Sequence, residues 1–174
     1  MIDVNTSLPS DKKITLNTDI MPTPYVIQDF NKDLQGWITN RFLPTIPDVE
    51  GGWEYWIQID FIAFIDAIYK IQFDFRREVP IDGGRLDWLI NSNTQDAVPY
   101  AVEIKAQTPK YLAAKLLKDV ADDIKKLESL GPKYRRIMLV AIIDQDTQEQ
   151  LVAKRPFEAV AKSPTMTLFR LDIA

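Results

Sequence analysis

The sequence contains neither cysteine nor histidine. Without cysteine, disulfides and thiolate metal sites are excluded. Without histidine, Ser-His-Asp and Cys-His hydrolysis and imidazole-bound zinc are excluded as well. Any catalysis must therefore use Asp, Glu, Lys, Tyr, Ser or Thr, and any metal site must be built from oxygen, which favours Mg²⁺, Mn²⁺ or Ca²⁺.

Long apolar runs and an excess of basic charge are lacking too. No stretch is long enough to span a bilayer, and the N-terminal MIDVNTSLPSDKK has no apolar signal core, so we expect a cytoplasmic protein without membrane contact. The net charge of −4 disfavours a general nucleic-acid coat protein, which is usually basic. A local basic groove stays compatible with this charge because the field that matters for binding is local.

What is present is an ordinary globular composition. The 174 residues are 46% apolar and 26% charged, which is typical of one domain with a core large enough to fold without disulfides or a structural metal. Residues 1–24 contain Pro9, Pro22 and Pro24, which predicts an extended lead-in. Residues 25–174 are expected to form a single domain.

Hydrophobic periodicity predicts the elements of this domain. Helices are expected at 25–44, 53–69 and 109–130, strands at 70–79, 85–90, 100–106, 135–143 and 166–173, a turn at 80–84 and a variable region at 144–165. The second helix is apolar nearly all round, which predicts a position in the core. Pro109 and Gly131 frame the third helix. The order predicts an α/β fold with a central mixed sheet flanked by helices.

The chemistry concentrates in the stretch YAVEIKAQ, residues 100–107. Side chains alternate along a strand, so Glu103 and Lys105 project from one face. Asp87 on the preceding strand lies near Glu103 if the two strands pair across the intervening loop. An E-x-K in a strand indicates, taken alone, a structural salt bridge. The combination D-(x)15-E-x-K on two strands, with a helix before and after, is more specific.

RLDWLI followed by YAVEIKAQ resembles the catalytic core of the PD-(D/E)XK nuclease superfamily, which has the restriction-endonuclease-like fold. The resemblance covers about residues 53–143, and Leu86 stands where the name-giving proline would be. It implies a nuclease that hydrolyses phosphodiester bonds, in DNA by our expectation, with Mg²⁺ or Mn²⁺ as cofactor. Asp87, Glu103 and the carbonyl of Ile104 would be metal ligands. Lys105 would orient or help deprotonate the attacking water and offset charge in the transition state.

Many members of this superfamily add an acidic residue from the first core helix, and two candidates compete here. Asp60 is the one charge in an apolar helical stripe, where an unpaired carboxylate needs a partner or a metal. Glu54 lies at the helix start, where exposed N–H groups favour a carboxylate in any case. We therefore expect Asp60 to be the additional catalytic and metal-binding residue, with Glu54 as the alternative. Gln58 either lines the same site or is a hydrogen-bonded core amide.

Further polar residues are candidates for substrate contact. Gln107 follows Lys105 by two, and the resemblance implies a catalytic polar residue there that touches the metal water or the substrate; solvation of the strand end is the alternative. A phosphate backbone requires a basic groove. The expected nucleic-acid contacts are Arg76, Arg85, Lys110 and Lys115, although such charges also occur simply on solvated faces.

Two other functions compete with the nuclease. A protein that keeps this fold without activity, as an immunity or regulatory factor, would bind a protein partner, and the acidic composition favours it. A structural Ca²⁺ site would require acidic residues in the D-x-[DN]-x-[DN]-G spacing, which is missing. Monomer and homodimer are both compatible with the sequence.

Overall fold

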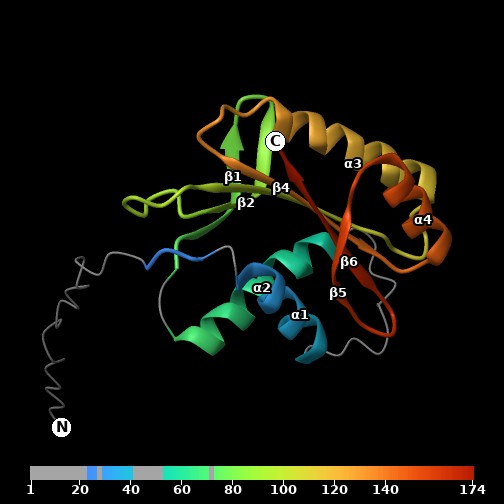
Figure 1. The fold of residues 1–174 in the computed structure, drawn as a ribbon, viewed down its shortest axis with the longest axis horizontal. Coiled ribbons are helices and arrows are strands. Elements are labelled where there is room, and N and C mark those ends of the chain that lie inside the picture. The colour runs from blue at the N-terminus through green and yellow to red at the C-terminus, as the bar shows by residue number, and fades with distance from the viewer. Residues whose placement is uncertain (1–22, 27–28, 41–52, 71–72) are drawn as a thin grey trace, which may run out of the picture.

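The computed structural model describes residues 23–26, 29–40, 53–70 and 73–174 (Figure 1). Within them the chain is an α/β protein with a six-stranded mixed sheet and four helices. The helices are α1 (Phe30–Asn40), α2 (Trp53–Tyr69), α3 (Ala113–Glu128) and α4 (Gln145–Lys154). The strands are β1 (Phe75–Ile81), β2 (Gly84–Ile90), β3 (Tyr100–Ala106), β4 (Arg135–Ile142), β5 (Glu158–Lys162) and β6 (Thr167–Ile173). No helix in these ranges is long and apolar enough to cross a membrane.

The sheet has the strand order β1-β2-β3-β4-β6-β5. Strands β3 and β4 are parallel and the other neighbouring pairs are antiparallel. A parallel pair needs a crossover connection, and α3 supplies it. The prediction that YAVEIKA forms a buried strand is confirmed: β3 lies inside the sheet, and all of its residues except Lys105 are buried.

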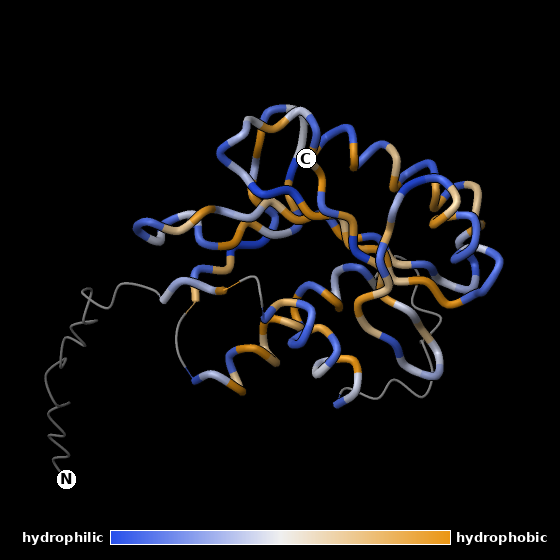
Figure 2. Tube along the Cα trace, in the orientation of Figure 1, coloured by the Kyte–Doolittle hydropathy of each residue, from blue (hydrophilic) through white to orange (hydrophobic). Residues whose placement is uncertain are grey.

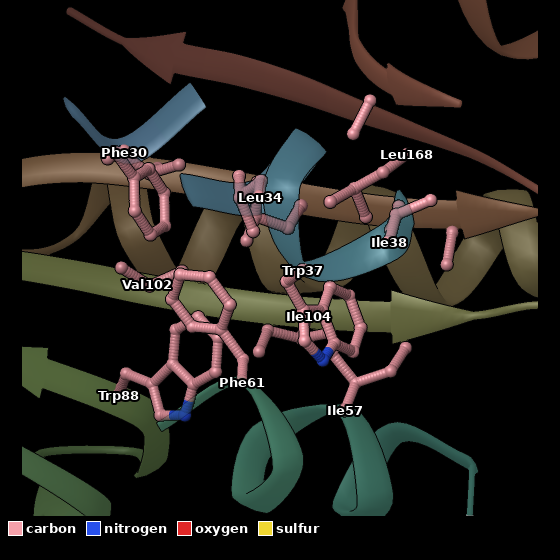
Figure 3. Packing of buried hydrophobic residues seen from close by; sticks show 14 of the residues in the cluster. Phe30, Leu34, Trp37, Ile38, Ile57, Phe61, Trp88, Val102, Ile104 and Leu168 are labelled. Atoms are coloured by element: carbon pink, nitrogen blue, oxygen red, sulfur yellow. The ribbon is translucent and has the colours of Figure 1, made fainter. Parts of the chain in front are cut away.

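Helices cover both faces of the sheet. In Figure 1, α1 and α2 lie on one face and α3 and α4 on the other. Hydrophobic segments run along the strands between these two layers (Figure 2). Val102 and Ile104 of β3 pack with α1 and α2 (Figure 3), and Ala101 packs with α3. Alternation along β3 therefore directs one set of residues to each helical layer.

Aromatic rings fill the layer between α2 and the sheet. Phe61 of α2 stacks on Trp88 of β2 with ring centroids 5.3 Å apart, and both side chains are fully buried. Burying a side chain of this size stabilises a fold by about 1.5–3 kcal/mol. The outer face of α2 differs from the all-round burial that its composition predicts, because Tyr55, Ile59 and Ile68 are each more than 40% exposed. The sheet needs only one face of the helix, and the other stays in water.

The first helix starts later than expected. Residues 23–26 are not helical, because the N–H of Tyr25 donates to Asn91 Oδ1 at 2.8 Å and its hydroxyl donates to Asp33 at 2.5 Å. Those bonds hold Tyr25 against the sheet layer in an extended segment. Residues 1–22 of the predicted lead-in (1–24) and residues 27–28 and 41–44 of the first predicted helix (25–44) lie outside the described residues.

Other boundaries also differ from the predictions. Pro80 and Ile81, expected in a turn, belong to β1; an edge strand tolerates proline because it has an unpaired side. Pro109 lies in a turn before α3, whose N-cap residue is Leu112. The variable region at 144–165 contains α4 and β5.

Candidate functional site

Strands β2 and β3 diverge at the predicted site. Their pairing stops after Val102, whereas β3 continues to Ala106. The N–H of Ile104 donates to Asp87 Oδ2 at 2.7 Å, and the N–H of Ala106 donates to Glu54 Oε1 at 3.3 Å. A buried backbone N–H needs an acceptor. The two carboxylates therefore take the place of a strand partner in this gap.

The gap also leaves the backbone of Ile104 without a partner strand on the β2 side. In an extended strand, the N–H and C=O of one residue point to the same edge. The Ile104 carbonyl, predicted as a metal ligand, consequently faces the same side of β3 as the Asp87 carboxylate.

Glu103 is the most deeply buried acid of the site, with 1% of its surface exposed. Its Oε2 lies 2.7 Å from Lys126 Nζ, and its Oε1 is buried without a hydrogen-bond partner among the described residues. Burial raises the pKa of Glu103 to about 8, and the nearby Asp87 carboxylate acts in the same direction. Burial also raises the pKa of Asp87 to about 6, against the opposing effect of the Ile104 N–H. The two acids therefore lie close enough to influence each other, as predicted.

Lys105 is held between two carboxylates. Its Nζ lies 2.9 Å from Asp123 Oδ2 and 3.3 Å from Glu54 Oε2. Burial acts to lower the pKa of Lys105, but Glu54 and Asp123 outweigh it and the pKa rises above its ordinary value. Lys105 is therefore protonated at neutral pH in the metal-free protein, which suits it to offset negative charge.

Glu54, Asp87, Glu103 and Lys105 belong to one cluster of charged side chains, and two further members of this cluster were not predicted. Asp123 and Lys126 of α3 contact each other at 3.2 Å, and they reach Lys105 and Glu103 across the sheet face. Lys126 also donates to the carbonyl of Arg85 at 3.0 Å. On an amphipathic helix, charges outside the apolar stripe are expected to face water. Asp123 and Lys126 lie beside the apolar stripe of α3, and side chains at the edge of such a stripe can reach the sheet that the stripe covers. That position could have indicated their contacts.

The preference for Asp60 over Glu54 is wrong. Asp60 Oδ2 accepts a hydrogen bond from Trp37 Nε1 at 2.8 Å, whereas Glu54 contacts Lys105. Glu54 and Gln58 are four residues apart and share one face of α2, and Gln58 Nε2 donates to Asp87 Oδ1 at 2.7 Å. Asp60 lies two residues beyond Gln58, about 200° around the helix axis.

The expected catalytic position of Gln107 is also corrected. Gln107 follows the end of β3, and its Oε1 accepts the N–H groups of Ile143 and Asp144 at 3.1 and 3.3 Å. Its Nε2 donates to Asp144 and to Thr147 Oγ1. Gln107 thus joins β3 to the start of α4 and is occupied by backbone and cap contacts. Those bonds explain its burial without any ligand.

The predicted nucleic-acid contacts are exposed but come from separate elements. Arg76 is on β1, and Arg85 on β2 forms a 3.8 Å ion pair with Glu78. Lys110 precedes α3, and Lys115 lies over the Tyr111 ring at 5.0 Å. Their contact with nucleic acid stays a prediction.

A surface hollow of about 490 Å³ lies at the other end of β3. Its lining includes Tyr100, Arg136 and Arg170. Arg170 is held by Asp172 and Asn31, and Arg136 donates to the carbonyls of Glu128, Leu130 and Ala174. The hollow is therefore separate from the acidic cluster, and two of its arginines have protein partners.

No family model matches the chain, and no curated protein or solved structure matches it either. The geometry shows an α/β protein with a mixed sheet and a partly buried cluster of charges. The restriction-endonuclease-like fold stays a prediction. The described elements follow the order α2-β1-β2-β3-α3-β4 through the cluster.

The oxygen donors of Asp87 and Glu103 suit the metal that the resemblance implies. Mg²⁺ prefers oxygen ligands and is held in many proteins by one or two carboxylates plus water. Asp87 and Glu103 supply two, and the unpartnered Oε1 of Glu103 is an acceptor that a cation would satisfy. In the part of the chain that the structure describes, no group of three or more Asp or Glu side chains is arranged to hold a metal. The residues fit a hydrated ion on two carboxylates and do not fit an all-protein cage.

Proposed function

We propose that the protein is a divalent-metal-dependent nuclease of the PD-(D/E)XK type that acts on DNA. One observation carries the proposal: where the pairing of β2 and β3 ends, the Asp87 carboxylate accepts from the N–H of Ile104, which lies between Glu103 and Lys105 on β3. The order of the elements around them supports it. Helix α2 is followed by the antiparallel strands β1, β2 and β3, and α3 then crosses over to β4, which is parallel to β3.

In this proposal, Asp87 and Glu103 hold Mg²⁺ or Mn²⁺, with the Ile104 carbonyl at the same edge of β3. The metal, when bound, supplies a more acidic water and relief of negative charge on the phosphate. Asp87 is fixed for this role by the N–H of Ile104. Glu103 lies in a nearly dry position, where electrostatic interactions are stronger than in water.

Lys105 contributes a fixed positive charge. In the metal-free protein its raised pKa keeps it protonated, which suits it to orient the attacking water and to stabilise charge on the phosphate. Glu54 and Asp123 hold the ammonium in place from two sides.

The test is cleavage of plasmid, linear DNA and RNA in the presence of Mg²⁺, Mn²⁺ or EDTA, with Asp87→Asn as the control. We expect metal-dependent cleavage of DNA by the wild type, loss of cleavage with EDTA and loss of cleavage in D87N. Cleavage that survives both EDTA and D87N would point to a contaminating enzyme. No cleavage of any nucleic acid with either metal ends the proposal.

The competing function is binding of a protein partner by an inactive domain of the same kind. One observation favours it: Lys105 and Lys126 already contact Glu54, Glu103 and Asp123, so part of the negative charge of the cluster is compensated without a metal. If this function is correct, divalent metal leaves both the melting temperature and nucleic acids unchanged.

A further inference from the structure

A chain of hydrogen bonds connects β1 to the candidate metal site. Arg77 Nη2 donates to Gln58 Oε1 at 3.0 Å, and Gln58 Nε2 donates to Asp87 Oδ1 at 2.7 Å. The N–H of Ile104 donates to the other oxygen of Asp87. Gln58 is 3% exposed, so its amide has little access to water and depends on these partners.

Arginine fixes the direction of this relay. A guanidinium only donates, so the group of Gln58 that faces Arg77 must be the carbonyl oxygen. The amide NH₂ must then face Asp87, which accepts as a carboxylate. While Arg77 stays in place, the Gln58 amide cannot flip: its oxygen stays toward Arg77 and its NH₂ toward Asp87. Asp87 therefore carries one N–H donor on each oxygen, which fixes the rotation of its carboxylate in the gap between β2 and β3.

Packing alone does not account for an arginine at this position. The guanidinium carbon of Arg77 lies 4.4 Å from the centre of the Tyr55 ring, which holds its plane. Its Nε is buried and has no hydrogen-bond partner among the described residues, which carries a desolvation cost. An unbranched apolar side chain would fill the space without that cost. What only the arginine provides is the donor to Gln58.

We propose that Arg77 is a positioning residue of the metal site, which acts through Gln58 to hold Asp87 in the orientation that a divalent ion requires. The inference rests on the proposed function, because it takes Asp87 as a metal ligand. Arg77 touches neither the metal nor the water on it. Partners that orient a metal ligand from behind commonly change metal affinity by about 10- to 100-fold when they are removed.

The experiment is a Mg²⁺ titration of the full chain, followed by thermal melting, with Mn²⁺ in parallel. Binding to the native state raises the melting temperature in a concentration-dependent way. We expect R77M to need about 10- to 100-fold more metal than the wild type for the half-maximal shift. R77K keeps a donor for Gln58 and should recover most of the loss.

Arg76→Met is the matched control. It removes the same charge from the neighbouring position of β1, where the side chain is exposed, so the metal requirement should equal that of the wild type. Equal requirements for R77M and R76M overturn the inference and leave the proposed function standing. No metal-dependent shift in the wild type overturns the metal site itself, and this inference with it.

Two further comparisons test the relay, and the first of them does not require R77M to fold. Gln58→Met interrupts it at the middle and should raise the metal requirement like R77M; an unchanged requirement overturns the inference. A metal-free comparison uses Asp87→Ala: R77M should lower the melting temperature less in the D87A background than in the wild type, because the end of the relay is already gone. Equal decreases in both backgrounds show that Arg77 and Asp87 are not coupled.

Discussion

Replacing Glu103 by glutamine should change how the stability of the metal-free protein depends on pH. Burial, followed by the field of Asp87, raises the pKa of Glu103 from its ordinary 4.5 to about 8. A raised acid pKa means that the native state binds the proton more tightly than the unfolded state. The free energy of unfolding is then highest below the ordinary pKa and falls as pH rises toward 8.

The size of this fall follows from the shift. One pKa unit corresponds to about 1.4 kcal/mol, so the rise of the Glu103 pKa from 4.5 to about 8 is worth on the order of 5 kcal/mol. Relaxation of the protein and entry of water reduce the cost of a buried charge, and we expect an observed fall of about 2–4 kcal/mol. Asp87, with a pKa raised to about 6, contributes its own fall at lower pH.

Glu103→Gln removes the proton uptake but keeps the shape of the side chain. The amide oxygen of the glutamine can still accept from Lys126, and the amide nitrogen then occupies the site of the unpartnered Oε1. The number of unsatisfied polar atoms is therefore the same in both proteins, and the difference between them isolates the charge.

The assay is urea unfolding in EDTA at intervals between pH 5 and pH 9, for the wild type and E103Q. We expect the wild type to lose stability between pH 6 and pH 8, and E103Q to keep a nearly constant free energy of unfolding over that interval. Between pH 5 and pH 6, both proteins should show the fall due to Asp87, and the wild type should fall more steeply because Glu103 adds its own contribution. A wild type that gains stability between pH 6 and pH 8, or an E103Q protein with the same slope, refutes the reasoning.

Three further outcomes are expected. Lys105→Ala should lower the rate of DNA cleavage by about 10²–10³-fold and leave a metal-dependent melting shift in place, as seen by plasmid nicking and thermal melting; loss of the melting shift would contradict a purely electrostatic role. Lys126→Met removes the ammonium beside Glu103 and should reduce the Mg²⁺ needed for the half-maximal melting shift by about tenfold, equivalent to 1.4 kcal/mol; a higher requirement would show that Lys126 supports the metal site. Asp60→Asn should not alter the metal requirement, because Asp60 accepts from Trp37 outside the cluster, and a clear increase in that requirement would restore Asp60 as a ligand.

The elements that sequence reasoning located well are those with a strong hydrophobic pattern. Helix α2 and strand β3 have the predicted bounds, because an unbroken apolar stretch between turn residues leaves one assignment. Helix α4 and strand β5 were missed, because in α4 only Thr147 and Leu151 are buried. A short helix that contacts the core through so few side chains has no periodicity strong enough to read.

The same limit applies to the cluster. Alternation along β3 predicted that Glu103 and Lys105 share a face, and the contacts with α3 bear this out. Helix α2 is apolar nearly all round, so its composition does not indicate which side faces the sheet, and Asp60 was chosen over Glu54. Lys126 was missed for the opposite reason: on an amphipathic helix, a charge that turns inward at the border of the apolar stripe has the same spacing as one that faces water.

The gap between β2 and β3 has a consequence for how the molecule folds. The contact between Glu54 and the backbone of Ala106 joins residues 52 positions apart, and the partners of Glu103 and Lys105 come from the crossover helix α3. Contacts of such separation form slowly, since the loop between them must be ordered first. Because a charge is costly to strip of water before its partners are in place, we expect the apolar faces of α2 and α3 to dock on the sheet before the charges between them lose their water. The repulsions of the cluster would then act on the final step of folding, not on the collapse that precedes it.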